Sequence, residues 1–214
     1  MNISDLKLYA VTDRKWLNGA KLSEHVKLAL EGGATMIQIR DKDILSHEGG
    51  MITDGMIKEQ EKEEALEIKR ICHEYKAPLI INDNVQFAIE IDADGVHLGQ
   101  DDMDPETARK LLGPDKIIGV TAKTAERKGA DYLGSGAVFG STTKLDAKPM
   151  SKELLKEITS SVDIPVVAIG GINAENAKKL KGTGIAGIAV VGGIFANDDI
   201  KLAAEQLAHI CDEL

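Results

Sequence analysis

Acidic and amide side chains directly follow two short apolar runs in the middle of the chain. Leu79–Ile81 precedes Asn82 and Asp83, and Gly95–Leu98 precedes an acidic stretch that includes Asp102. Strands of a parallel barrel that end in such residues bring them to one mouth. Two converging carboxylates without an adjacent base suit Mg²⁺, which completes its shell with water and substrate phosphates. Alternatively, each aspartate could cap the helix that follows its strand.

A second cluster carries positive charge. In the run 38–42, strand alternation points Gln38, Arg40 and Lys42 to one side and Ile39 and Asp41 to the other. If that side is the barrel interior, two cations and an amide face the mouth, and such a set suits a pyrophosphate. The alternative is a layer of salt bridges that closes the barrel.

Three further segments could hold anions. The glycine-rich segment 134–144 ends in hydroxyl groups followed by Lys144, and these can surround an anion, although an ordinary turn is the alternative. Gly-Gly pairs at 170–171 and 192–193 follow the seventh and eighth apolar runs. Loops at these positions often bind phosphate in barrels, through backbone N–H groups at a helix N-terminus. The alternative is that these glycines only permit tight turns.

The elements that would position these groups alternate regularly. Apolar strand-like runs occur at 8–12, 36–40, 78–82, 95–98, 117–121, 132–135, 165–169 and 187–191. Helical periodicity occurs at 22–31, 59–75, 85–91, 105–112, 151–160, 173–181 and 198–214. Eight such units predict an α/β fold, a (β/α)₈ TIM barrel formed by residues 1–214 as a single domain. An open doubly wound sheet is the alternative, disfavoured because Val11-Thr12-Asp13-Arg14 replaces a glycine-rich fingerprint.

Two connections depart from this pattern. The segment 44–58 is longer than a usual strand-to-helix loop, and loops of that length are often lids or disordered. Conversely, only residues 122–129 precede the sixth unit, whereas a parallel crossover normally needs about a dozen residues or more. We therefore expect a shortened crossover after strand 5, with at most one helical turn.

The composition narrows the functional class. The 214 residues carry a net charge of −9, which argues against a nucleic-acid surface but not against a local anion site. The two cysteines indicate buried thiols in a reducing compartment. Neither a signal peptide nor an apolar run of about 18 residues is evident, so we expect a cytoplasmic protein that is not bound to membranes. His97 is expected to be a hydrogen-bonded core residue rather than a general base.

Together these segments resemble the thiamine phosphate synthase (thiamine-phosphate pyrophosphorylase) family over nearly the full length. The matching segments are Tyr-Ala-Val-Thr-Asp (9–13), Gln-Ile-Arg-Asp-Lys (38–42), Ile-Asn-Asp (81–83), Ala-Asp-Gly-Val-His-Leu-Gly-Gln-Asp-Asp (93–102), Gly-Ala-Asp-Tyr (129–132), Thr-Thr-Lys (142–144) and Ala-Ile-Gly-Gly-Ile (168–172). The chain differs from the usual family pattern at Thr121 and Gly192, where the family has Ser, and at Gly140 and Ser141, where it has Pro and Thr.

The resemblance implies a transferase that joins a pyrimidine diphosphate to a thiazole phosphate and releases pyrophosphate. Asp83 and Asp102 would hold Mg²⁺, the implied cofactor. Arg40, Lys42 and Lys144 would act as electrostatic catalysts. The residues implied to contact the two substrates are Gln38, Arg40, Lys42, Asn82, Thr121, Ser141, Thr143, Lys144, Gly171, Val191 and Gly192. The reaction would be a dissociative substitution, which needs neither a base nor a nucleophilic side chain.

Two other functions are compatible with the same barrel. A thiazole tautomerase-like isomerase would need the thiazole phosphate site but neither aspartate, so Asp83 and Asp102 argue against it. A binding-only barrel without turnover is supported solely by the short fifth crossover. The expected partners are the two small-molecule substrates, with neither nucleic acid nor membrane, and assembly into a homo-oligomer stays open.

Overall fold

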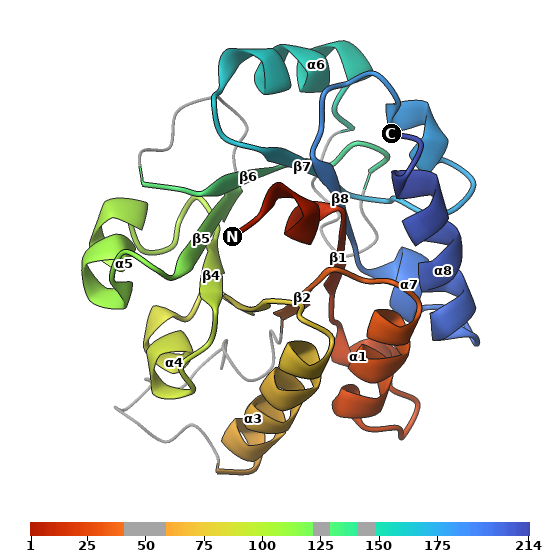
Figure 1. The fold of residues 1–214 in the computed structure, drawn as a ribbon. Helices are drawn as coiled ribbons and strands as arrows, with labels where there is room; N and C mark the ends of the chain where they lie inside the picture. The colour runs from red at the N-terminus through yellow and green to blue at the C-terminus, as the bar shows by residue number, and fades with distance from the viewer. Residues whose placement is uncertain (41–58, 122–128, 141–148) are drawn as a thin grey trace.

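The computed structural model describes residues 1–40, 59–121, 129–140 and 149–214 (Figure 1). Eight parallel strands form a closed barrel in the order β1 to β8, with β8 paired to β1. The strands are β1 (Leu8–Val11), β2 (Met36–Ile39), β3 (Leu79–Asn82), β4 (Gly95–Leu98), β5 (Ile117–Thr121), β6 (Tyr132–Gly136), β7 (Val166–Ile169) and β8 (Gly187–Val190). The predicted TIM barrel is therefore confirmed.

Helices surround this barrel in the end-on view of Figure 1. The α-helices are α1 (Leu22–Glu31), α3 (Glu59–Glu74), α4 (Val85–Glu90), α5 (Pro105–Leu112), α6 (Lys152–Ser161), α7 (Gly192–Phe195) and α8 (Ile200–Cys211). Three 3₁₀ helices are η1 (Ile3–Leu6), η2 (Arg14–Trp16) and η3 (Ala177–Leu180). Among the described residues, no helix has both the length and the apolarity needed to cross a lipid bilayer.

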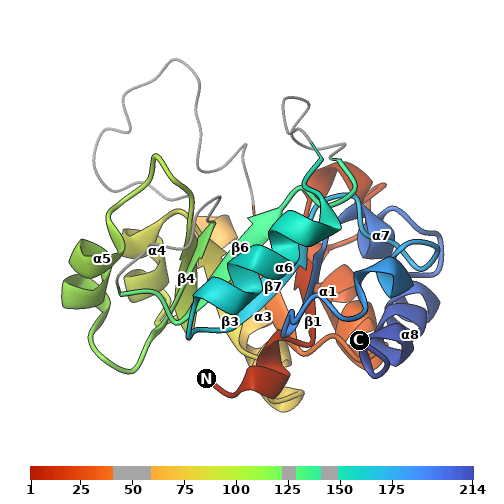
Figure 2. The same cartoon turned by 90° about the horizontal axis from the view of Figure 1, so that it is seen from above.

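Two apolar layers hold the barrel together. Alternate strand residues fill the interior, among them Tyr9, Met36, Ile80, Tyr132 and Val167. The other set packs outward against the helices, so the strands are apolar on both faces, as continuous apolar runs predict. Leu6 of η1 joins the interior layer at the N-terminal end of the barrel, and Figure 2 shows η1 below the strands. The N-terminal end of the barrel is therefore filled by apolar side chains, and a functional site is expected at the opposite, C-terminal end of the strands.

The seventh crossover differs from the helix predicted over 173–181, because only the 3₁₀ helix η3 forms there. Asn173 Oδ1 accepts hydrogen bonds from the backbone N–H groups of Glu175 and Asn176, and Asn176 Oδ1 accepts from the Asn173 N–H. Side chains of Asn compete in this way with the helical hydrogen-bond pattern. The short helix α7 was not predicted either; Val191, which caps it, separates it from β8.

The fifth crossover is short, since β5 ends at Thr121 and β6 begins at Tyr132. Residues 122–128 and the long segment 44–58 lie outside the described residues, so the expected single turn and the expected lid stay predictions. The Arg109 side chain of α5 supports this part of the wall. It donates to the carboxylate of Asp131 at 2.6 Å and to the carbonyl groups of Gly113 and Lys116. Asp131 also accepts from the Ile118 N–H at 2.7 Å, which ties α5, β5 and β6 together.

We expect Arg109→Met to lower the free energy of unfolding by about 2–3 kcal/mol, because hydrogen bonds to charged groups are lost and carbonyl oxygens are left unpaired. Urea unfolding monitored by circular dichroism measures this. Lys110→Met removes the same charge from the exposed side of α5 and is the matched control. Equal unfolding midpoints for the two variants would contradict the bracing role of Arg109.

Candidate active site

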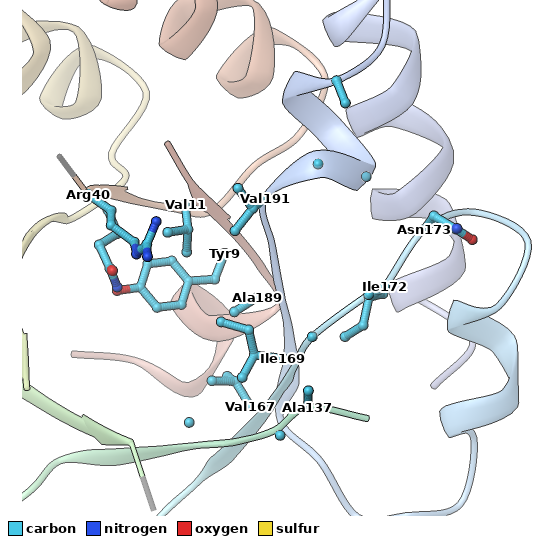
Figure 3. Close-up of a pocket in the computed structure, with 18 of the residues that line it drawn as sticks. Tyr9, Val11, Arg40, Ala137, Val167, Ile169, Ile172, Asn173, Ala189 and Val191 are labelled. Atoms are coloured by element: carbon cyan, nitrogen blue, oxygen red, sulfur yellow. The ribbon is translucent and has the colours of Figure 1, made fainter. Parts of the chain in front are cut away.

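A pocket of about 1830 Å³ opens at the C-terminal mouth of the barrel. The interior ends of the strands form its floor, while the first turns after β1, β7 and β8 form its walls. Figure 3 shows Arg40, Tyr9 and Val11 on one side, with Ile169, Ile172 and Asn173 across from them. The floor is therefore mixed in polarity, and its polar groups come from β1 to β5.

The structure brings most of the predicted substrate residues into this single pocket. Its lining includes Gln38, Arg40, Asn82, Thr121, Gly171, Val191 and Gly192. Strand alternation explains why Gln38 and Arg40 both reach the pocket. Gln38 lies in β2 and Arg40 directly follows it, so the two side chains point to the same, interior side. Four other predicted residues, Lys42, Ser141, Thr143 and Lys144, lie outside the described residues.

Asp83 lies directly after β3 in an unusual conformation. Its φ is +61°, in the left-handed region that non-glycine residues seldom adopt. Its N–H donates to the carbonyl of His97, and its carboxylate accepts from the Asn82 amide at 2.6 Å. The helix α4 is capped by Asn84, whose Oδ1 accepts from the Phe87 N–H at 2.9 Å. The capping alternative for Asp83 is therefore wrong, and its carboxylate is instead paired with Asn82, which lines the pocket.

Asp102 lies in the loop after β4 and is likewise not a helix cap. The cap of α5 is Asp104, which accepts from the Thr107 N–H at 3.0 Å. One oxygen of Asp102 accepts instead from the Gly99 N–H at 2.6 Å. A Cβ at residue 99 would lie 2.5 Å from this oxygen, so glycine permits the approach. The loop thus holds the Asp102 carboxylate close to the end of β4.

The two carboxyl groups contact each other beside the pocket, although neither aspartate is among the residues that line it. Partial desolvation and a hydrogen-bonded, like-charged neighbour in Asp102 raise the pKa of Asp83 to about 6, against the opposing effects of Asn82 and Arg40. A bound cation would relieve this repulsion. Within the described ranges, no group of three or more acidic, His or Cys side chains could hold a metal ion. A pair of carboxylates fits Mg²⁺, because this ion retains water and substrate oxygens as its other ligands.

The glycine corners after β7 and β8 have different steric demands. Gly171 has a φ of +66°, and a Cβ there would lie 2.7 Å from the carbonyl oxygen of Phe139. Gly192 begins α7, and a Cβ there would meet only Ala196, at 3.8 Å. The first N–H groups of a helix lack partners within the helix. Both corners therefore present backbone to the pocket, and Gly192 alone has room for a side chain.

Sequence reasoning missed a hydrogen-bonded chain beneath the pocket. Gln38 Nε2 donates to Tyr9 Oη at 2.5 Å, and Tyr132 Oη donates to Tyr9 Oη at 2.9 Å. His97 connects Tyr132 to Thr121, with Nδ1 3.0 Å from Tyr132 Oη and Nε2 2.9 Å from Thr121 Oγ1. His97 is hydrogen-bonded as expected, and it also lines the pocket. Strand alternation could have placed both tyrosines inside the barrel.

The chain is similar to known proteins over nearly its full length. Residues 8–194 match a family model described as thiamine monophosphate synthase. The chain is 47% identical over 211 residues to a thiamine-phosphate synthase of Clostridium novyi (strain NT), covering 95% of this chain and 98% of that protein. The corresponding protein of Clostridium tetani (strain Massachusetts / E88) is 45% identical, with coverages of 98% and 97%. A solved thiamine phosphate pyrophosphorylase from Pyrococcus furiosus superposes with a TM-score of 0.83 at 38% identity, covering 99% of this chain and 98% of that one.

Proposed function

Because this chain belongs to the thiamine monophosphate synthase family, we propose that it joins 4-amino-5-hydroxymethyl-2-methylpyrimidine diphosphate to 4-methyl-5-(2-phosphoethyl)thiazole. The products would be thiamine phosphate and pyrophosphate. The chain is a transferase with thiamine-phosphate synthase function. The observation that carries the specific reaction is the contact between Asp83 and Asp102 near Arg40, where Asp83 is hydrogen-bonded to Asn82 of the pocket lining.

The diphosphate would bind between this pair of carboxyl groups and Arg40. Asp83 and Asp102 would hold Mg²⁺, which when bound supplies positive charge to the diphosphate oxygens. Arg40 approaches from β2 closely enough to lower the pKa of Asp83, and its planar guanidinium can pair with two phosphate oxygens. Lys42 and Lys144, outside the described residues, are proposed to add further positive charge. Gln38 and Asn82 would orient the pyrimidine ring from the floor.

The thiazole phosphate would occupy the opposite side of the pocket. The backbone at Gly171, Val191 and Gly192 is proposed to hold its phosphate, joined by Ser141 and Thr143. Tight glycine corners support this role, since a Cβ at residue 171 would press against the Phe139 carbonyl. The thiazole nitrogen would then face the pyrimidine methylene carbon across the floor.

The residues present favour a dissociative substitution. The bond between the methylene carbon and the diphosphate oxygen breaks, and the bonding electrons leave with the diphosphate. The lone pair of the thiazole nitrogen then forms the new carbon–nitrogen bond. This nitrogen has no proton to lose, so the site needs no general base. The task of the chain is to stabilise charge on the leaving group and to keep water from the cation, which is preorganised electrostatic catalysis.

The direct test is synthesis from the two purified substrates, with thiamine phosphate and pyrophosphate measured together. We expect both products in equal amounts, with loss of turnover on adding EDTA and recovery with excess Mg²⁺. Turnover unaffected by EDTA would contradict the metal assignment. Isomerisation of a thiazole phosphate without condensation would favour the tautomerase-like alternative, and tight product binding without synthesis the binding-only one.

Metal binding should weaken as the pH falls. The folded-state pKa of Asp83, about 6, exceeds the ordinary aspartate value of 3.8, so protons compete with Mg²⁺ below about pH 6. Single-proton competition predicts a dissociation constant about fourfold higher at pH 5.5 than at pH 7.5, measurable by isothermal titration calorimetry. Without metal, the contribution of Asp83 to the free energy of unfolding falls as the pH rises from about 4 to about 6, because the folded state holds the proton more tightly than the unfolded state. A salt-bridged acid shows the opposite pH dependence. Equal dissociation constants at both pH values would contradict this coupling.

Gly192→Ser should lower KM for the thiazole phosphate about tenfold, because a hydroxyl there can donate a charge-assisted hydrogen bond to the phosphate. The position has space, since the nearest atom to a new Cβ is 3.8 Å away. Gly193→Ser is the matched control, for there a Cβ would lie 2.3 Å from the Ile172 carbonyl oxygen and should destabilise the corner. Steady-state kinetics and melting temperatures distinguish the two variants. An unchanged KM in a stable Gly192→Ser protein would mean that the thiazole phosphate binds elsewhere.

A further inference from the structure

Thr12 directly follows β1 and contacts β2 twice, once through its backbone and once through its side chain. Its N–H donates to the carbonyl of Gln38 at 2.9 Å, and its hydroxyl oxygen accepts from the N–H of Arg40 at 3.1 Å. The two bonds lie on either side of Ile39, the last residue of β2. Thr12 is 1% exposed, so both bonds are shielded from water. One buried residue thus holds the backbone of two residues that are proposed to contact the substrate.

The Thr12 hydroxyl extends the pairing of β1 with β2 beyond its regular end. The last regular pair is Val11 opposite Gln38. In a parallel ladder, the next N–H of the second strand would donate to a backbone carbonyl of the first. The chain turns into η2 soon after Thr12, and the hydroxyl oxygen is the acceptor for the Arg40 N–H. The direction of this bond is unambiguous, because a backbone N–H group can only donate.

This bond bears on where the Arg40 side chain points. Side chains alternate along an extended backbone, so an extended segment 38–40 directs Gln38 and Arg40 to the same side. Both residues line the pocket, and Figure 3 shows Arg40 reaching into it beside Tyr9. Arg40 is the first residue beyond β2. Because its side chain is long, a small backbone rotation there would carry the guanidinium away from Asp83.

The two contacts of Thr12 can be separated by substitution. Valine has nearly the shape of threonine but lacks the hydroxyl, so Thr12→Val would take this acceptor from the Arg40 N–H. Backbone N–H groups that lose a partner must find another one, in the protein or in water. The bond from the Thr12 N–H to the Gln38 carbonyl does not involve the side chain and would remain. The substitution should therefore loosen Arg40 and leave Gln38 in place.

We propose that Thr12 is a positioning residue, which acts through the backbone of Arg40 to keep its guanidinium where the leaving diphosphate binds. The inference rests on the proposed function, in which Arg40 pairs with diphosphate oxygens. Thr12 is not among the residues that line the pocket, so it would act without touching the substrate. The position of Arg40 supports the inference, because its charge is close enough to oppose the rise in the pKa of Asp83.

The variant Thr12→Val tests this role in the reaction. We expect kcat/KM for the pyrimidine diphosphate to fall about tenfold, less than for Arg40→Met, because the guanidinium is displaced and not removed. KM for the thiazole phosphate should stay unchanged, since its proposed site lies across the pocket. Thr12→Ser restores the hydroxyl and should recover most of the activity. An unchanged kcat/KM in Thr12→Val, or a loss that Thr12→Ser shares, would overturn the proposal.

A double-mutant cycle tests whether the hydroxyl acts through Arg40. In an Arg40→Met background, Thr12→Val should cause no further loss of kcat/KM, because there is no guanidinium left to position. Two residues that act independently would instead show multiplied losses. A further tenfold loss in the double variant would overturn the proposal.

The opposite end of the same two strands offers a matched control. The hydroxyl oxygen of Thr35, which precedes β2, accepts from the N–H of Leu8 in β1 at 2.9 Å. This bond is of the same kind but lies at the N-terminal end of the barrel, away from the pocket. Thr35→Val should lower the melting temperature as Thr12→Val does, with kcat/KM unchanged. If Thr35→Val lowers kcat/KM as much as Thr12→Val, the effect is one of general stability and the positioning role is overturned.

Two measurements without turnover separate this inference from the proposed function. Titration calorimetry with inorganic pyrophosphate and Mg²⁺ should give a dissociation constant about tenfold higher for Thr12→Val than for the wild type, and equal constants would overturn the inference. NMR hydrogen exchange should show a protected Arg40 N–H in the wild type that loses protection in Thr12→Val. An unprotected Arg40 N–H in the wild type would overturn the inference even if no variant folds. A protein that shows these differences but makes no thiamine phosphate would contradict the proposed function alone.

Discussion

Asp83→Asn should lower the rate of thiamine phosphate formation by about 10²–10³, the order expected when one preorganised electrostatic group is removed. The change removes one of two carboxylates that would hold Mg²⁺ against the diphosphate. It should not destabilise the folded protein, since Asn tolerates a left-handed backbone such as the φ of +61° at this residue. The loss should appear in kcat and in Mg²⁺ affinity together.

The same reasoning applies to Asp102→Asn, although here the hydrogen bond from the Gly99 N–H is preserved by the amide oxygen. Asp101→Asn, one residue away and exposed, removes the same charge and is the matched control. Initial rates across a Mg²⁺ titration measure all three variants. If Asp83→Asn unfolds, or if Asp101→Asn loses as much activity as Asp102→Asn, the metal assignment fails and the acidic stretch acts through its overall charge.

Arg40→Met should lower kcat/KM on the order of 10²–10³, about as much as Asp83→Asn lowers the rate. The charge that develops on the departing diphosphate loses a bidentate partner in a partly desolvated pocket. The position follows β2, where the Arg40 N–H donates to the buried hydroxyl of Thr12 at 3.1 Å. That bond involves the backbone and survives the substitution. The fold should therefore be retained.

Arg40→Lys distinguishes geometry from charge. Lysine retains the charge but lacks the planar fork, so we expect it to recover only part of the activity. Arg70→Met, on the exposed face of α3, removes the same guanidinium outside the pocket and should leave kcat/KM unchanged. Full activity in Arg40→Met would contradict a role for this residue at the leaving group.

Much of the architecture was determined by the sequence alone. Each strand lies within one residue of its predicted apolar run, because strands buried on both faces must be continuously apolar. Alternation along β2 was enough to direct Gln38 and Arg40 into the same pocket. Local signals failed where side chains competed with the backbone, as at Asn173 and Asn176, where hydrogen bonds to nearby N–H groups replaced the predicted helix.

The tertiary structure decided how the functional groups are presented. Sequence spacing left Asp83 and Asp102 as helix caps or metal ligands, and only the structure assigned the caps to Asn84 and Asp104. The contact between Tyr9 and Tyr132 could not be predicted from local sequence either, because they are 123 positions apart and meet only when the barrel closes. Periodicity along a chain indicates which face a side chain takes. Which partner it finds across the barrel depends on closure and on small residues, such as Gly119, that leave it space.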